Sequence, residues 1–174
     1  MTWLKDKIEI LKCDITTLHV DAIVNAANRK LLWWGWVDWA IHAAAGYELL
    51  QECKTLNGCE TGEAKLTKGY NLPAKYVIHT VWPIWRWWNA WEPELLKRCY
   101  ENSLAIANRE CFKTIAFPSI STGIYGYPLT QAAKIAIDTI LKCLEKYPEI
   151  EKIIISCFDE TNKSIYESIL SDVA

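Results

Sequence analysis

The stretch from Val24 to Gly46, VNAANRKLLWWGWVDWAIHAAAG, decides the fold. It opens as the end of a short apolar strand, which we place at residues 21–25, and it finishes as a helix, which we place at residues 37–53. The helix is indicated by apolar side chains that recur at spacings of four and three and therefore share one face. A strand, a loop and a helix in this order put the loop at the carboxyl end of a sheet, where open α/β folds bind their ligands.

Polar side chains mark both ends of this loop. Asn25 and Asn28 follow the strand and Asp38 opens the helix, so we expect the three to converge on one crevice and count Asn25 among the ligand-binding residues. An aspartate in the first turn of a helix is also favoured by the helix dipole alone, and then needs no ligand. The loop itself is unusual, because loops at anion-binding helix starts are normally rich in glycine, whereas here three tryptophans surround Gly35.

The rest of the chain alternates strands and helices. We predict strands at residues 7–13, 21–25, 63–68, 75–80, 114–117 and 150–158, and helices at residues 37–53, 92–108, 128–147 and from Thr161 or Asn162 onward. The last strand is strongly apolar, which indicates a central position. The order ββαββαβαβα predicts a three-layer α/β/α fold around a mixed sheet. No break in composition divides residues 1–174, so we expect one domain.

Composition excludes several classes of protein. The 174 residues carry a net charge of −2, which implies no general attraction to nucleic acid or to a membrane surface. Charged residues interrupt the N-terminal segment, so we expect no signal peptide, and no apolar run approaches the about 20 residues that span a bilayer. The seven cysteines form no Cys-x-x-Cys pair, and with the three histidines they show no metal-ligand spacing. We expect a reduced, cytoplasmic protein without metal or cofactor.

A second loop, from Ser119 to Gly126, connects a predicted strand to a predicted helix. Its glycines allow backbone N–H groups to point inward beside a helix N-terminus, an arrangement that binds diphosphates. An ordinary strand–helix connection is the alternative, because a lone Gly-x-x-Gly is weak evidence. If the loop binds a ligand, we expect contacts from Ser121, Thr122, Gly123, Ile124, Tyr125 and Gly126, with the tyrosine covering the ligand.

Two further residues stand at predicted strand ends. Asp14 follows the first strand, where a carboxylate can accept a hydrogen bond from an exocyclic amine or simply cap a turn. Phe158 ends the last strand, where its ring can stack on a base or belong to the core. The residues themselves leave both alternatives open. His42, one turn after Asp38, is at a position where a packing residue is more common than a catalyst, and we assign it no role.

Four separated motifs resemble the macrodomain family, in the family's order. They are Lys12–Thr16, the Asn-Ala-Ala-Asn stretch that begins at Asn25, the strands within residues 61–81, and Pro118–Pro128. The resemblance covers nearly the whole chain. It implies an ADP-ribose site without a metal and, in the hydrolase branch, mono-ADP-ribosylated protein or O-acetyl-ADP-ribose as the substrate.

The resemblance also implies roles for single residues. Asp14 would read the adenine 6-amino group with Ile15 beside it, and residues 119–126 would hold the diphosphate. Asn28 would bind the distal ribose. Asp38 would orient a water or a ribose hydroxyl for attack, as an ionised carboxylate beside a sugar hydroxyl can do.

Eight tryptophans stand where the family usually has glycine. They form two clusters in two loops, one of Trp33, Trp34, Trp36 and Trp39, and the other of Trp82, Trp87, Trp88 and Trp91. The family often has arginine where this chain has Ala43 and histidine where it has Ala90, and it usually has glycine where this chain has Cys13. We interpret these differences as a redesign of the binding loops, which would make the chain an engineered variant.

Three functions follow from the resemblance and the departures. The first is an ADP-ribosyl-protein hydrolase or O-acetyl-ADP-ribose deacetylase, active or disabled. The second is a binding module that holds ADP-ribose weakly, or holds a flat aromatic ligand in a pocket lined by tryptophan. The third is a folded scaffold without a small-molecule partner. Indoles inside the crevice would weaken ADP-ribose binding, and indoles facing outward would form an apolar patch. Scattered Lys and Arg disfavour nucleic acid as a partner.

Overall fold

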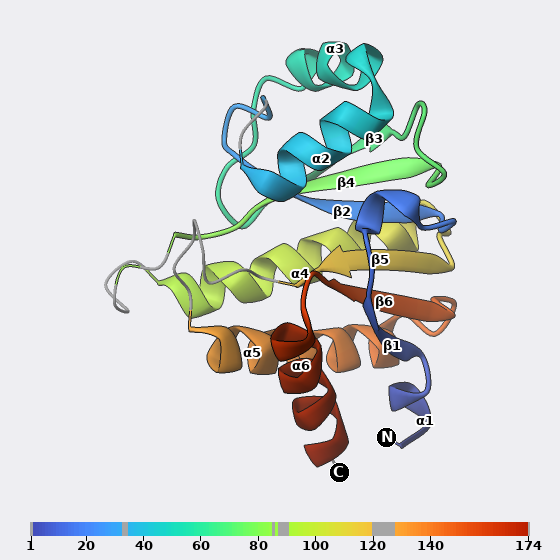
Figure 1. Ribbon diagram of the computed structural model, residues 1–174, viewed down its shortest axis with the longest axis vertical. Coiled ribbons are helices and arrows are strands. Elements are labelled where there is room, and N and C mark those ends of the chain that lie inside the picture. The colour runs from blue at the N-terminus through green and yellow to red at the C-terminus, as the bar shows by residue number, and fades with distance from the viewer. Residues whose placement is uncertain (1, 33–34, 85, 87–90, 120–127, 174) are drawn as a thin grey trace.

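The computed structural model describes residues 2–32, 35–84, 86, 91–119 and 128–173. Its elements are α1 (Thr2–Lys5), β1 (Ile8–Lys12), the 3-10 helix η1 (Ile15–Thr17), β2 (Ala22–Ala27), α2 (Trp36–Ala45), α3 (Tyr47–Thr55), β3 (Ala64–Lys68), β4 (Tyr76–Val81), α4 (Glu92–Arg109), β5 (Thr114–Pro118), α5 (Leu129–Lys146), β6 (Lys152–Cys157) and α6 (Glu160–Asp172). The described strands form one sheet in the order β1-β6-β5-β2-β4-β3 (Figure 1). Among them β3 runs antiparallel to its neighbour and the other pairs are parallel, so the sheet is mixed as predicted.

Helices cover both faces of the sheet. Side chains alternate along β2, so that Ile23 packs with α2 and α3 while Val24 packs with α4 and α5. The same alternation on neighbouring strands divides the buried apolar side chains into two clusters, one on each face. Figure 1 shows α2 and α3 at one end of the molecule and α5 with α6 at the other. The predicted three-layer α/β/α fold is confirmed.

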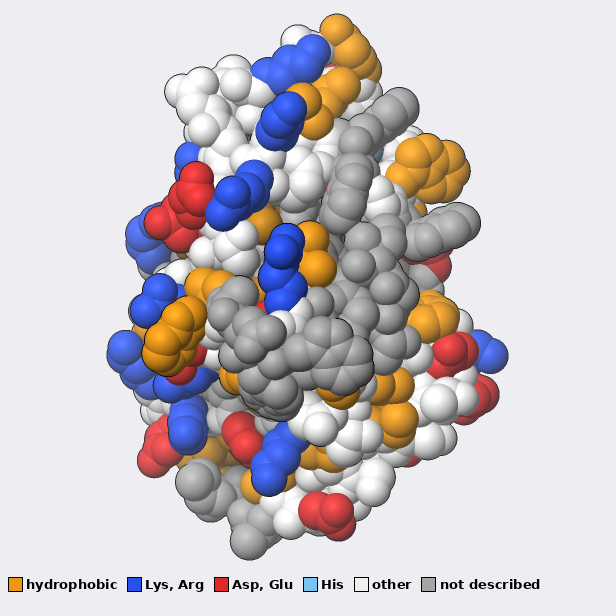
Figure 2. Space-filling model, turned by 90° about the vertical axis from the view of Figure 1, so that its left-hand side faces the viewer, with side chains coloured by type: hydrophobic (Ala, Val, Ile, Leu, Met, Phe, Trp, Pro, Cys, Tyr) orange, Lys and Arg blue, Asp and Glu red, His pale blue; other side chains and the backbone are white. Residues whose placement is uncertain are grey.

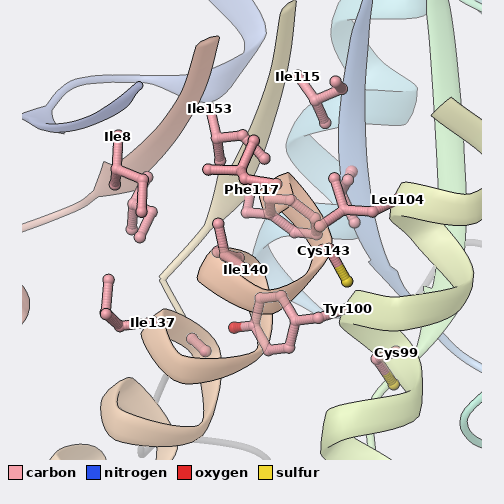
Figure 3. Close-up of a cluster of buried hydrophobic side chains, with 14 of the residues drawn as sticks. Ile8, Cys99, Tyr100, Leu104, Ile115, Phe117, Ile137, Ile140, Cys143 and Ile153 are labelled. Carbon is pink, nitrogen blue, oxygen red and sulfur yellow. The ribbon is translucent and has the colours of Figure 1, made fainter. Parts of the chain in front are cut away.

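The larger apolar cluster includes Tyr100 at the contact of α4 with the sheet (Figure 3). Its ring centroid lies 5.0 Å from that of Phe117 and 5.2 Å from that of Trp82. Each such ring removes about 150–250 Å² of surface from water, which makes aromatic contacts a large part of core stability. These contacts fix α4 against β5 and against the residue that follows β4, close to the carboxyl ends of both strands.

The predicted helix over residues 37–53 is wrong in one respect, because it is two helices. α2 ends at Ala45 and α3 begins at Tyr47, with Gly46 between them at a φ of 97°. Such a positive φ suits glycine, which has no Cβ. The Gly46 N–H donates to the His42 carbonyl at 3.0 Å and so caps α2. Apolar periodicity that continues past residue 46 concealed the break.

Other boundaries differ by a few residues. The last helix, expected from Thr161 or Asn162, begins at Glu160, because the Asp159 carboxylate accepts from Asn162 N at 2.8 Å and caps it. β6 pairs with both β1 and β5, which agrees with the internal position expected from its apolar sequence. No pattern predicted the short helices α1 and η1.

Five parallel strands end at the same edge of the sheet. This carboxyl edge carries the segments that follow β1, β2, β4, β5 and β6, and therefore the loops in which the sequence analysis placed ligand-binding residues. Figure 2 views the side of the molecule on which α4 and α5 begin, where Lys and Arg side chains gather along one flank of the described surface. No helix within the described residues is long and apolar enough to cross a membrane.

Candidate functional site

Asp14 lies at the carboxyl end of β1 and is exposed. Its Oδ1 atom accepts hydrogen bonds from Thr16 N at 2.9 Å and from Thr16 Oγ1 at 2.7 Å, and so caps the 3-10 helix η1. Both bonds fall on Oδ1, and no described residue forms a hydrogen bond with Oδ2. The two roles that the sequence allowed for this residue, cap and ligand acceptor, are therefore compatible.

Phe158 lies close to Asp14 because β1 and β6 are neighbouring parallel strands. The pairing continues to the strand ends, where Cys13 N donates to the Cys157 carbonyl at 3.1 Å. Phe158 is 63% exposed, so it is not a core aromatic residue, whereas Ile15 is buried. This end of the sheet thus combines an exposed carboxylate with an exposed ring.

Asn25 and Asp38 meet inside the protein. Asn25, on β2, is fully buried, and Asp38, in the first turn of α2, is 1% exposed. Asn25 Nδ2 donates to Asp38 Oδ1 at 2.6 Å. His42 Nε2 lies 3.4 Å from the same carboxylate oxygen, and the histidine is equally buried. The pair is therefore part of the interior beneath the site, and His42 packs against it.

A buried polar network extends from this pair. Asn25 Nδ2 also lies 3.1 Å from His79 Nδ1, and His79 Nε2 lies 2.8 Å from Thr67 Oγ1. Burial, and secondarily the His42 ring, lowers the pKa of His79 to about 3, so its ring is neutral near pH 7. Sequence reasoning missed His79 and Thr67. The signal was a histidine in an otherwise apolar strand, since a buried polar group requires a partner.

Asn28 organises its own loop, residues 28–32. Its Oδ1 accepts from Lys30 N at 2.9 Å and its Nδ2 donates to the Leu32 carbonyl. The backbone carbonyl of Arg29 accepts from Cys59 N at 2.8 Å, which ties the loop to the turn at residues 57–59. The structure therefore joins Asn25 to Asp38, but it gives Asn28 no hydrogen bond to either within the described residues. The convergence of Asn28 with the other two on one crevice stays a prediction, and its amide is held by its own loop.

The predicted diphosphate loop lies mostly outside the described residues. This applies to Ser121, Thr122, Gly123, Ile124, Tyr125 and Gly126, whose roles stay predictions. The described start of the loop is well anchored, because Ser119 is buried and its N–H donates to the Ser156 carbonyl at 2.8 Å. The pairing of β5 with β6 therefore continues to the point where the loop leaves the sheet.

Three of the eight loop tryptophans have described side chains. Trp82 is buried beside Tyr100, whereas Trp39 is 57% exposed and Trp91 is 80% exposed. The remaining positions lie outside the described residues, namely Trp33, Trp34, Trp87, Trp88 and the side chain of Trp36. Trp82 thus belongs to the apolar core, a position that the sequence analysis did not consider, whereas Trp39 and Trp91 face outward.

Trp91 carries a backbone strain that glycine would not. It precedes α4 at a φ of 62° and a ψ of 29°, and the left-handed region costs an L-residue roughly 1–2 kcal/mol. We expect Trp91→Gly to raise the free energy of unfolding by about 1 kcal/mol in urea denaturation. Trp39→Gly, the same change at an exposed position inside α2, should lower it by about 0.5 kcal/mol. Changes of the same sign in both variants would contradict the assignment of strain to Trp91.

Among the described residues, no group of three or more His, Cys, Asp or Glu could hold a metal ion. All seven cysteines are free thiols. Burial raises the pKa of Cys53, which lies next to the polar network, to about 12, so this thiol stays protonated at neutral pH.

The fold and the site define a class of protein, an α/β domain with its candidate ligand site at the carboxyl ends of five parallel strands. The sequence model of the Macro domain family matches residues 24–136. A Macro domain-containing protein of Chlorobaculum tepidum is 57% identical, with 94% of this chain and 95% of that protein covered. The chain belongs to the Macro domain family, which confirms the resemblance noted in the sequence.

Relatives with more specific names include an O-acetyl-ADP-ribose deacetylase of Enterobacter cloacae, 46% identical over 97% of this chain and 96% of that protein. The mouse ADP-ribose glycohydrolase MACROD2 is 51% identical over 97% of this chain, which spans 36% of that protein. Among solved structures, a mutant of the Oceanobacillus iheyensis macrodomain with ADPR superposes with a TM-score of 0.90 at 42% identity, covering 94% of this chain and 91% of that chain.

Proposed function

We propose that the protein binds ADP-ribose at the carboxyl edge of the sheet. The observation that carries the proposal is the pair at the ends of β1 and β6, an exposed Asp14 carboxylate close to the exposed ring of Phe158. An adenine offers an exocyclic amine that needs an acceptor and a flat face that stacks on an aromatic ring. The similarity to a macrodomain solved with ADPR supports the same ligand class.

Calorimetric titration with ADP-ribose, and with AMP alongside, tests this proposal. Asp14→Ser keeps a capping oxygen for η1, because serine is as good an N-cap as aspartate, but it removes the carboxylate. We expect this variant to bind both ligands about 10- to 100-fold more weakly, the equivalent of one hydrogen bond to a charged group. Asp6→Ser, a change of an exposed aspartate at the opposite end of β1, is the matched control. Equal affinities for the two variants would refute the role of Asp14.

We further propose that the chain descends from macrodomains that remove ADP-ribose from mono-ADP-ribosylated protein or deacetylate O-acetyl-ADP-ribose, with turnover weakened by the tryptophan loops. The named relatives support this lineage. Asp38 supplies a carboxylate that can orient a water or a ribose hydroxyl. Its burial, at 1% exposed and bonded to Asn25, argues for slow turnover.

Release of ADP-ribose from a mono-ADP-ribosylated protein tests the enzymatic part. Wild type should release more than Asp38→Ala, and equal release would refute the assigned chemistry. A variant with glycine at the seven tryptophan positions other than the buried Trp82 should bind ADP-ribose more tightly and turn over faster. If that variant performs no better than wild type, the indoles do not limit the site. Binding of AMP without binding of ADP-ribose would locate the obstruction at the distal ribose.

A further inference from the structure

We propose that Glu92 is a positioning residue, which fixes the backbone at Arg86 in the segment after β4 and so controls the affinity for the distal half of ADP-ribose. Glu92 is the first residue of α4 and is fully buried, at 0% exposed. Its Oε1 atom accepts a hydrogen bond from Arg86 N at 2.9 Å. The inference rests on the proposed function, because it concerns one end of the same ligand site.

The hydrogen bond between Glu92 and Arg86 has only one possible direction. A backbone N–H can only donate and a carboxylate oxygen can only accept, so the assignment does not depend on a rotor or a tautomer. A hydrogen bond to a carboxylate is also stronger than one between two neutral groups. Glu92 therefore holds the backbone at Arg86 close to the first turn of α4.

Burial distinguishes Glu92 from the other glutamate in the first turn of α4. Glu94 is exposed and is solvated by water. A buried carboxylate is costly unless hydrogen-bond donors replace the lost water. Glu92 Oε2 has no hydrogen-bond partner among the described residues, so the Arg86 N–H and the positive end of the α4 dipole are the compensation that the described part of the chain provides. Glu92 is thus placed to fix Arg86, and Glu94 is not.

The start of the segment after β4 is attached to α4 independently of Glu92. Trp82, which directly follows β4, is 3% exposed, and its ring centroid lies 5.2 Å from that of Tyr100 on α4. The segment is therefore attached through an apolar contact at Trp82 and through a hydrogen bond at Arg86. Replacing Glu92 removes the second attachment and leaves the first, so we expect the core to stay folded.

The order of the strands determines which part of the ligand the segment after β4 can reach. The proposed adenine site lies at the ends of β1 and β6, the loop predicted to hold the diphosphate follows β5, and Asn28, predicted to bind the distal ribose, follows β2. β4 is the next strand in the sheet, and with neighbouring strands about 4.8 Å apart its end lies about 14 Å from that of β6, three strand spacings away. The segment after β4 therefore flanks the distal end of ADP-ribose, whereas AMP ends at its only phosphate.

Calorimetric titration with ADP-ribose and with AMP tests the proposal. Glu92→Ala removes the acceptor, and we expect it to weaken ADP-ribose binding about tenfold, the equivalent of one hydrogen bond to a charged group, with AMP affinity within about twofold of wild type. Glu92→Gln keeps an acceptor oxygen for Arg86 N and should restore the affinity for ADP-ribose. Glu94→Ala, the matched control, removes an exposed carboxylate from the same helical turn and should bind both ligands as wild type does.

Hydrogen exchange of the Arg86 amide, followed by NMR, tests the contact without a ligand. A hydrogen-bonded amide exchanges slowly until its bond opens. The exchange should therefore be slow in wild type, in Glu92→Gln and in Glu94→Ala. It should be about tenfold faster in Glu92→Ala, because the described acceptor of the Arg86 N–H is then missing.

Three results would overturn the proposal. An equal loss of affinity for ADP-ribose and AMP in Glu92→Ala would indicate a general loss of structure, and an unchanged affinity for ADP-ribose would mean that Glu92 does not act on the distal half. Fast exchange of the Arg86 amide in wild type would mean that Glu92 does not hold this backbone. A wild type that binds no ADP-ribose contradicts the proposed function, and the exchange rates then still decide whether Glu92 fixes Arg86.

Discussion

Gly58→Ala is expected to lower the free energy of unfolding by about 3 kcal/mol and to loosen the loop at residues 28–32. Gly58 has a φ of 82°, and a Cβ there would lie 2.7 Å from the Arg29 carbonyl oxygen. A backbone oxygen cannot move aside as the end of a side chain can. The same oxygen accepts the hydrogen bond from Cys59 N. The added methyl group would therefore separate Arg29 from residues 57–59 and weaken this hydrogen bond between the turn and the loop at residues 28–32.

Urea denaturation measures the stability loss, and calorimetric titration with ADP-ribose measures the consequence for the site. We expect the affinity to fall together with the stability, because the loop displaced by the methyl group carries Asn28. Asn57→Gly is the matched control, since Asn57 also has a positive φ, of 58°, and glycine adds no atom. That variant should stay within about 0.5 kcal/mol of wild type. A Gly58→Ala protein of wild-type stability would mean that the turn is not seated against Arg29.

Acidification is expected to destabilise the protein through His79. Burial, and then the His42 ring, lowers the pKa of His79 to about 3 from its ordinary value of 6.5. Above the ordinary value the ring is neutral in both the folded and the unfolded chain. Below a pH of 6.5 the unfolded chain takes up the proton while the folded chain does not. The free energy of unfolding therefore decreases as the pH falls from 6.5 toward about 3, the pKa of His79 in the folded chain. The slope from this residue is about 1.4 kcal/mol per pH unit.

Comparison with His79→Gln isolates this contribution. Between about pH 6.5 and about pH 5, wild type should lose about 2 kcal/mol more than the variant, as measured by urea denaturation at each pH. The variant is expected to be less stable at neutral pH, because glutamine does not reproduce both ring contacts, but its pH profile should be flatter. All other side chains are common to both proteins, so the difference between the two pH profiles isolates His79. Parallel profiles would refute a neutral buried His79.

Local sequence patterns were sufficient for the layers of the fold but not for every break within them. Consecutive apolar residues in β4 and β6 indicate strands buried on both faces, and both strands lie inside the sheet. Gly46 lies within an apolar pattern that continues into α3. A contact that is distant in sequence accompanies the break, because Asn71 N donates to the Ala45 carbonyl at 3.1 Å. No local pattern contains that contact.

In the candidate site, too, some features could be predicted from the local sequence and others depend on contacts between residues that are distant in sequence. Asp14 and Phe158 could be assigned to strand ends, because a strand end follows from the periodicity of the sequence. Asn25 was expected at the end of a strand over residues 21–25, but it lies inside β2, which continues to Ala27. The partners of Asp38 could not be predicted, because they are set by pairing across the sheet, where Asn25 lies opposite His79. Register between strands far apart in sequence is a property of the assembled sheet. Membership of the macrodomain family came from the motifs, and the comparisons confirmed it.

The adjacency of β1 and β6 has a consequence for how the molecule is made. In the sheet β1 has β6 as its neighbour, and Ile8 pairs with Ile153, a separation of 145 residues (153 − 8). Contacts between residues this distant in sequence form late in folding, because closing so long a loop costs conformational entropy before the contact can stabilise the chain. During synthesis on the ribosome the first strand therefore waits for the last one to emerge. The adenine site that we propose for Asp14 and Phe158 can form only after that pairing, so we expect a nascent chain to bind no nucleotide until β1 and β6 have paired.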